Sequence, residues 1–126
     1  MSRLARACLL PVLLAPAGAL GAERSLTVTA TAYNSLPGQT HGNPRVAAWG
    51  DVLVPALRSV AVSPDLLKLG LRRGVRVRID GLRGEFVVLD KMPARWQRRI
   101  DLYMGRDVEA ARTFGRREVQ ITWTGS

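Results

Sequence analysis

Apolar and polar residues alternate with a period of two in several short stretches, which is the pattern of half-buried β-strands. In residues 26–33, threonines and Tyr33 alternate with small apolar residues, and in 74–79 valines and an isoleucine alternate with arginines. Turn residues then lead into the segment 85–89, which is apolar after Glu85, so these last two segments are predicted to form a hairpin. Further short strands are predicted at residues 59–62, 99–103 and 118–123.

Two short helices are predicted between these strands. The tripeptide Ser-Pro-Asp at 63–65 places a capping residue before a proline, which suits a helix that runs through Leu69. Asp107 is a second candidate cap, for a helix that ends near Thr113. About six short strands without the rhythm of α-crossovers predict a small, mainly antiparallel or mixed β-barrel.

Residues 34–49 contain Pro-Gly and Gly-Asn-Pro and show little periodicity. They are predicted to form an irregular surface loop, because these residue combinations interrupt regular structure. Loops of this length in a small domain often bind ligands, so the polar residues of the loop, Thr40 among them, are candidates for contacts with a substrate.

The first 22 residues differ in composition from the rest of the chain. Arg3 and Arg6 precede a run of sixteen uncharged residues that ends in small residues, which is typical of a secretory signal peptide. Prolines and glycines interrupt this run, which is shorter than the roughly 20 residues of a membrane-spanning helix. We predict a signal peptide at 1–22, a mature domain at 23–126 without a transmembrane span, and export to the periplasm or cell envelope. A retained anchor is the less favoured alternative.

Basic residues outnumber acidic ones, 19 to 10, and the net charge is +9. Such an excess attracts polyanions. An exported protein meets lipid headgroups, anionic surface polymers and peptidoglycan, so no nucleic acid partner is expected. A solvated basic surface without any partner is the simpler alternative.

The sequence lacks the residues that several classes of catalytic site require. His41 is the only histidine, and the only cysteine, Cys8, lies in the predicted signal peptide. A conventional zinc site, a Ser-His-Asp triad and a cysteine nucleophile are therefore excluded. No Gly-rich phosphate-binding loop is present either. We expect neither a metal nor a cofactor, and carboxylates remain as the candidate chemistry.

Two aspartates occupy strand positions from which they could meet. Asp90 follows one predicted strand and Asp101 lies within the next. Alternation places Asp90 on the face of Phe86 and Val88, and Asp101 on the face of Tyr103. If the strands are neighbours, the two carboxyls share one groove, where one pKa rises and that group can act as an acid near neutral pH. The alternative is a structural role, in which the carboxyls bind turn amides.

Five segments in order resemble the 3D domain, a family named for three aspartates: 29–33, 58–63, 74–77, 88–90 and 99–105. The resemblance extends from residue 26 to 123, and Ile-Asp-Leu-Tyr-Met-Gly at 100–105 is its most specific piece. It implies a six-stranded double-psi β-barrel, shared with the catalytic domain of membrane-bound lytic transglycosylase A, with RlpA-like proteins and with expansins. It also implies a peptidoglycan glycan strand as the substrate.

The resemblance further implies that Asp101 is the general acid/base and that Asp90 sits beside it. Ser63 stands where the family has its third aspartate, and Lys91 to Trp96 replace a region that commonly holds a glycine pair. We expect Asp101 to protonate the glycosidic oxygen and then accept the C6 hydroxyl proton, which would give a 1,6-anhydro product. Trp96 is the preferred sugar platform, and the other candidate substrate contacts are Tyr33, Trp49, Tyr103, Thr40, Lys91 and Arg99.

Two alternatives to a lytic transglycosylase remain open. A noncatalytic cell-wall glycan-binding module with a basic rim is favoured by Ser63 and by the bulky segment 91–96. A polyanion binder would depend on the arginines alone. Trp49 and Trp123 have an alternative as well, because a large aromatic residue in a small domain commonly belongs to the core.

Overall fold

The computed structural model describes residues 22–36 and 45–125. Thr40, His41 and all of the predicted signal peptide except Ala22 lie outside these ranges. In the described part of the chain, no helix is long and apolar enough to cross a bilayer.

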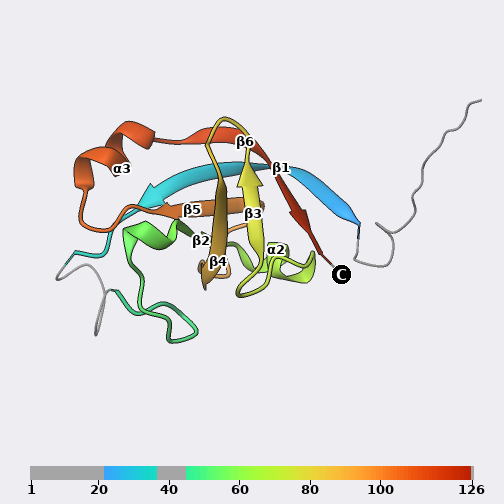
Figure 1. Ribbon diagram of the computed structural model, residues 1–126, viewed down its shortest axis with the longest axis horizontal. Helices are drawn as coiled ribbons and strands as arrows, with labels where there is room; N and C mark the ends of the chain where they lie inside the picture. Colours follow the sequence, from blue (N-terminus) through green and yellow to red (C-terminus); the bar gives the residue numbers. More distant parts are fainter. Residues whose placement is uncertain (1–21, 37–44, 126) are drawn as a thin grey trace, which may run out of the picture.

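The described residues form six strands that close into a barrel in the order β1-β5-β2-β4-β3-β6 (Figure 1). Two neighbouring pairs, β1 with β5 and β2 with β4, are parallel, and the other four are antiparallel. The mainly β, six-stranded barrel predicted from the alternation is therefore confirmed. The strands are β1 (Glu23–Tyr33), β2 (Ser59–Val62), β3 (Arg76–Ile79), β4 (Glu85–Lys91), β5 (Arg99–Tyr103) and β6 (Arg117–Thr124).

Two short α-helices and a 3-10 turn connect the strands: α2 (Pro64–Lys68), α3 (Val108–Phe114) and η3 (Pro55–Leu57). Asp107 caps α3 as predicted, since its carboxylate accepts a 2.9 Å hydrogen bond from the amide of Ala110. Ser63 precedes α2, but its hydroxyl does not cap the helix and instead accepts from the amide of Arg99 at 3.0 Å. Ser63 is therefore the N-cap residue of α2 as predicted, with Pro64 at the start of the helix, but its hydroxyl binds the backbone of β5.

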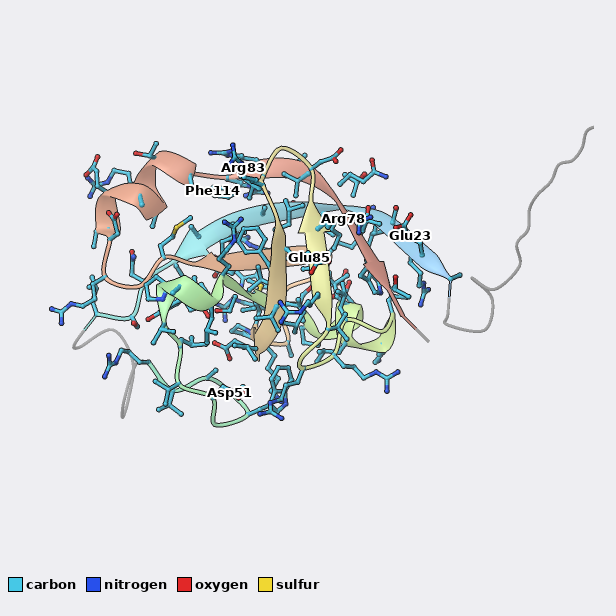
Figure 2. The ribbon with its side chains drawn as sticks, in the orientation of Figure 1. Glu23, Asp51, Arg78, Arg83, Glu85 and Phe114 are labelled. Carbon is cyan, nitrogen blue, oxygen red and sulfur yellow. The ribbon has the colours of Figure 1, made fainter. Side chains whose placement is uncertain are left out.

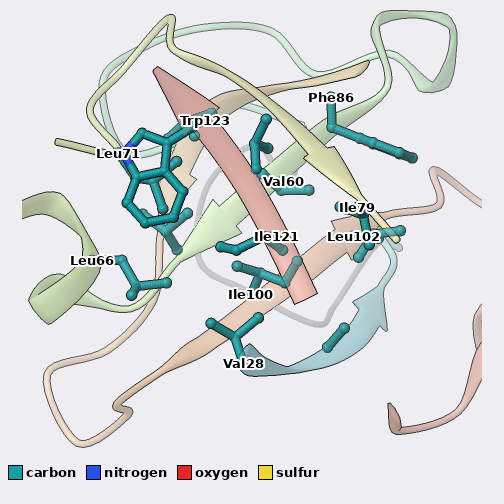
Figure 3. Close-up of a cluster of buried hydrophobic side chains, with 14 of the residues drawn as sticks. Val28, Val60, Leu66, Leu71, Ile79, Phe86, Ile100, Leu102, Ile121 and Trp123 are labelled. Carbon is teal, nitrogen blue, oxygen red and sulfur yellow. The ribbon is translucent and has the colours of Figure 1, made fainter. Parts of the chain in front are cut away.

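The inner face of the barrel is the hydrophobic core (Figure 3). Val28, Val60, Ile100 and Ile121 come from four different strands, and each is at most 1% exposed. Burial of such a side chain stabilises the fold by about 1.5–3 kcal/mol. Trp123 is also in the core, and its indole N–H donates to the carbonyl of Leu69 at 3.2 Å. The core alternative for this tryptophan is confirmed.

The outer surface carries scattered ion pairs far from this core. Arg78 and Glu23 point toward each other and pair at 2.8 Å (Figure 2). Asp51 pairs with Arg73 at 2.7 Å, and the hydrogen bond from Arg73 lowers the pKa of Asp51 below its ordinary value. Exposed pairs of this kind contribute little to stability. The second pair nevertheless links the 45–54 segment to the residues that follow α2.

Candidate functional site

Strand pairing brings the two candidate aspartates onto one face of the barrel. Ala61 of β2 is paired with Asp101 on one side and with Asp90 on the other. Asp101 is paired in turn with Thr31 of β1. Directly paired residues point to the same side of a sheet, so Thr31, Asp101, Ala61 and Asp90 form a row across four strands. The Cα atoms of Asp90 and Asp101, two strands apart, are separated by about 10 Å.

Asp90 reaches this row because the pairing of β2 with β4 shifts by one residue. Val60 is paired with Val88, but Ala61 is paired with Asp90, so Leu89 is the extra residue. A bulge of this kind reverses the alternation beyond it. The predicted placement of Asp90 on the inward face of Val88 is therefore wrong, and its side chain lies outside the barrel.

Asp101 is partly buried, and within residues 22–36 and 45–125 only one of its carboxylate oxygens is hydrogen-bonded. Its Oδ1 accepts a 2.9 Å hydrogen bond from the hydroxyl of Thr31, whereas its Oδ2 has no partner among the described residues and is not buried. Burial raises the pKa of Asp101 above its ordinary value, against the opposing effects of the Thr31 hydrogen bond and the Arg99 charge. The charge of Asp90 raises this pKa as well, but it is the smallest of these causes. The pKa shifts in the predicted direction, mainly through desolvation rather than through the second carboxylate.

Both carboxylate oxygens of Asp90 are hydrogen-bonded within the protein. Its Oδ1 accepts from the amides of Ala48 at 2.8 Å and Lys91 at 2.9 Å, and its Oδ2 accepts from the hydroxyl of Tyr33 at 3.2 Å. Burial and this contact raise the pKa of Tyr33 well above its ordinary value, so the phenol remains a donor at neutral pH. Asp90 therefore fastens the 45–54 segment and Tyr33 to the barrel.

Tyr33 and Tyr103 pack together on the same outer face. Their rings meet edge to face with centroids 5.4 Å apart, and the hydroxyl of Tyr103 is 2.5 Å from that of Ser35. Tyr103 is only 6% exposed, because Ala47 and Leu53 pack over it. Both tyrosines were predicted sugar contacts. Tyr103 is buried and packs against Tyr33, and Tyr33 is the more exposed of the two.

Trp96 stacks with two arginines, one of which, Arg99, is two residues before Asp101 in β5. The guanidinium carbon of Arg99 is 4.0 Å from the ring centroid of Trp96, and that of Arg95 is 5.1 Å away. The indole that was predicted to be a sugar platform therefore has a cation over its ring. Its contact with Arg99 makes it a support for that side chain.

The remaining predicted contacts are spread more widely. Trp49 packs against the core and lines a separate hollow with Leu67, Lys68, Arg72 and Arg73. Lys91 is exposed at the end of β4, next to Asp90. The structure thus places Tyr33, Lys91 and Arg99 near the aspartates and Trp96 beside Arg99. Trp49 follows Ala48, whose amide binds Asp90, but its side chain lines the separate hollow.

Two members of the row were not among the predicted site residues. Thr31 binds the carboxylate of Asp101, and its position in 26–33, on the polar face with Tyr33, was a signal that could have found it. Ala61 lies between the two aspartates and is itself buried, at 4% exposed, while the Tyr33 side chain reaches from β1 to Asp90 on β4. Nothing in the sequence around Ala61 marked this position, because it follows from strand order.

A pocket of about 510 Å³ lies at another part of the barrel, beside α3. Phe86, Leu102 and Phe114 supply apolar walls, and Arg58 and Asp107 supply charges. Neither Asp90 nor Asp101 lines this pocket. Within residues 22–36 and 45–125, no cluster of three or more His, Cys, Asp or Glu residues is placed to hold a metal ion.

Comparison with solved structures shows the same barrel elsewhere. The chain is similar to an expansin from Clavibacter michiganensis, with a TM-score of 0.55 and 21% identity over 80% of this chain and 50% of that one. It is equally similar to a Streptomyces papain inhibitor, with a TM-score of 0.55 and 19% identity over 80% of this chain and 94% of that one. The fold is a double-psi β-barrel, and the chain spans about half the length of the expansin. No family model matches it, and no curated protein sequence matches it.

Proposed function

We propose that this domain binds a cell-wall glycan across the Asp101–Ala61–Asp90 row on the outer face of β5, β2 and β4. One observation carries the proposal: among the described residues Asp101 is hydrogen-bonded through Oδ1 alone, so its Oδ2 has capacity for a further hydrogen bond. A carboxyl oxygen in this position can bind a sugar hydroxyl. Ala61, between the two aspartates, is buried, so the ligand would contact the polar side chains that flank it.

Similarity supports a glycan ligand without deciding it. The expansin shares the barrel, and the resemblance of segments 29–33 and 99–105 to 3D domains suggests the same class of ligand. The papain inhibitor shares the barrel equally well. Because one fold can host unrelated functions, the proposal depends on the residues of the row.

Cleavage of the glycan is the second candidate function, and the pKa of Asp101 is the observation that favours it. Burial raises this pKa, which increases the fraction of the carboxyl that is protonated near neutral pH. The protonated group would donate to the glycosidic oxygen, and the carboxylate that remains would take the proton of the C6 hydroxyl as that hydroxyl attacks C1. The glycosidic bond breaks and a 1,6-anhydro ring forms, so no second carboxylate is needed to activate water.

Both candidates can be tested in one experiment with purified peptidoglycan sacculi. The protein is incubated with sacculi, sedimented binding is measured at low and high salt, and the supernatant is analysed by mass spectrometry. Binding without soluble product supports the glycan-binding function alone. Anhydro-muropeptides that disappear with Asp101→Asn add the cleavage activity.

Two results would overturn these assignments. No sedimentation with sacculi at low salt would remove the glycan-binding function. Binding that falls steeply with salt and is indifferent to Asp101→Asn would identify a polyanion binder that depends on its arginines. The matched control is Asp80→Asn, which changes an exposed aspartate in the turn after β3 and removes the same charge.

A further inference from the structure

The backbone of Arg99 is fixed at the start of β5. Its amide donates to the hydroxyl of Ser63 at 3.0 Å, and its carbonyl accepts from the amide of Ser63 at 2.9 Å. Arg99 is two residues before Asp101 in the same strand, so both side chains leave the outer face of the barrel. The serine that replaces the expected third aspartate thus positions an arginine beside the candidate acid.

The guanidinium of Arg99 is held in place without a direct ion pair among the described residues, although the charge of Asp101 lies near it. It stacks on Trp96 at 4.0 Å, and its Nη2 donates to the hydroxyl of Thr31 at a long 3.4 Å. Its Nε is buried without a partner, whereas Nη1 has no partner among the described residues and stays accessible. No acidic residue in the described ranges forms an ion pair with Arg99.

The partly buried guanidinium of Arg99 favours an anionic ligand. Burial of Nε removes part of the hydration of the guanidinium, so a charge partner on the Nη side gains more than it would at a fully solvated arginine. The planar fork of a guanidinium matches a carboxylate in two parallel hydrogen bonds. Trp96 keeps the fork in one orientation, which lowers the entropy that the side chain loses on binding.

The surroundings add positive charge and little negative charge. Lys91 and Arg95 are exposed and form no ion pair with the described residues. The nearby acid Asp65 accepts from the backbone amide of Arg98 at 2.9 Å rather than from a guanidinium. Asp101 itself lies close enough for the charge of Arg99 to lower its pKa. A ligand at this place meets Asp101 and Asp90 of the row, but near Arg99 the cations Lys91 and Arg95 add to its positive charge.

We infer that the glycan bound by this face carries carboxylates on its sugars, and that Arg99 binds one of them while Asp101 contacts the neighbouring sugar. This inference rests on the proposed glycan-binding function and assigns the charge of its ligand. Ser63 and Trp96 are positioning residues for Arg99, and Arg99 is a specificity-determining residue. A neutral glycan of the same shape lacks the partner for the guanidinium.

The test compares two forms of one ligand on the full chain. Peptide-free peptidoglycan strands, which carry a carboxylate on every second sugar, are compared by calorimetry with the same strands after reduction of that carboxylate to an alcohol. The wild-type protein should bind the carboxylated strands about tenfold or more tightly, the usual value of a charge-assisted hydrogen bond. Equal affinity for the two forms would overturn the inference and leave glycan binding intact.

Three variants locate the effect. Arg99→Gln should lose the preference for carboxylated strands while keeping the affinity for reduced strands, and Arg99→Lys should restore only part of it. Arg116→Gln, at an exposed arginine between α3 and β6, removes the same charge and should leave the preference unchanged. An equal loss in Arg116→Gln would contradict a specific site, and so would tighter binding of single-stranded DNA than of the carboxylated strands. Binding to neither form would instead refute the proposed function.

Discussion

The two ends of the Asp101–Ala61–Asp90 row use the same side chain for different purposes. At the β4 end, Asp90 accepts three hydrogen bonds and has no oxygen left for a ligand. At the β5 end, Asp101 accepts one from Thr31 and leaves Oδ2 open. Equivalent positions on either side of one strand thus give a carboxylate with three hydrogen bonds and a carboxylate with one among the described residues.

This difference shows that two carboxylates in one row do not have to determine each other's pKa. The expected arrangement had the two groups setting each other's pKa, but Asp90 is the weakest contributor to the raised pKa of Asp101. Partial burial of Asp101 is the largest cause of its raised pKa. Asp90 contributes by holding Tyr33 and the 45–54 segment in place around the row.

The largest effect is expected from removing the anchor. Asp90→Ala should lower the free energy of unfolding by about 1–3 kcal/mol, because two backbone amides and a phenol lose a charged acceptor. Urea denaturation followed by fluorescence measures this change. Asp80→Ala is the matched control, since that exposed side chain makes no hydrogen bond with the described residues. Equal losses in the two variants would show that Asp90 is not an anchor.

At the β5 end of the row, substitution of Asp101 is expected to stabilise the fold rather than destabilise it. Asp101→Asn should raise the melting temperature at pH 7, because it removes a charge that burial disfavours while an amide oxygen still accepts from Thr31. The folded pKa of Asp101 lies above the unfolded value, so its ionisation opposes folding above the folded pKa. This penalty vanishes below the ordinary carboxyl value of 3.8. The gain should therefore shrink as the pH falls toward that value, and a gain that is constant with pH would contradict this account.

A smaller effect is expected from the hydroxyl between Asp101 and Arg99. Thr31→Val should raise the pKa of Asp101 further, because the Thr31 hydrogen bond lowers it in the native protein. An NMR titration of the Asp101 side-chain carboxyl carbon measures the shift. Thr29→Val, two residues earlier on the same face, is the control and should leave this pKa unchanged.

The smallest effect should come from the charge of Asp90 on Asp101. Asp90→Asn should lower the pKa of Asp101 by less than Thr31→Val raises it, because Asp90 is the smallest of the contributing causes. The same NMR titration measures it. A larger drop would restore the coupled pair that the sequence suggested.

The alternating stretches predicted most of the strands, because burial of one face determines which residues alternate. The cap of α3 could be predicted from Asp107, because aspartate is a preferred capping residue. The position of Asp90 could not be predicted in this way, since a one-residue shift between β2 and β4 reverses the face while the alternation of β4 up to that point looks regular. The row through Ala61 depends on strand order, which pairs Ala61 with Asp90, 29 residues later, and with Asp101, 40 residues later.

The stack of Arg99 on Trp96 was equally hidden. Both residues were candidate ligand contacts, but their mutual contact depends on the turn between β4 and β5, where Trp96 donates its amide to the carbonyl of Pro93 at 3.1 Å. No periodic signal extends through that turn. The contact changes the role of Trp96 from a predicted sugar platform to a support for the Arg99 guanidinium.

The central claim is that ligand binds over Asp101, and backbone NMR shifts test it most directly. Isotope-labelled protein is titrated with peptide-free peptidoglycan strands, and the amide shifts are mapped on the barrel. We expect the largest changes at Thr31, Ala61, Arg99 and Asp101 in the row and beside it. Changes that centre instead on Phe86 and Phe114 in the pocket beside α3, or no changes at all, would contradict the claim.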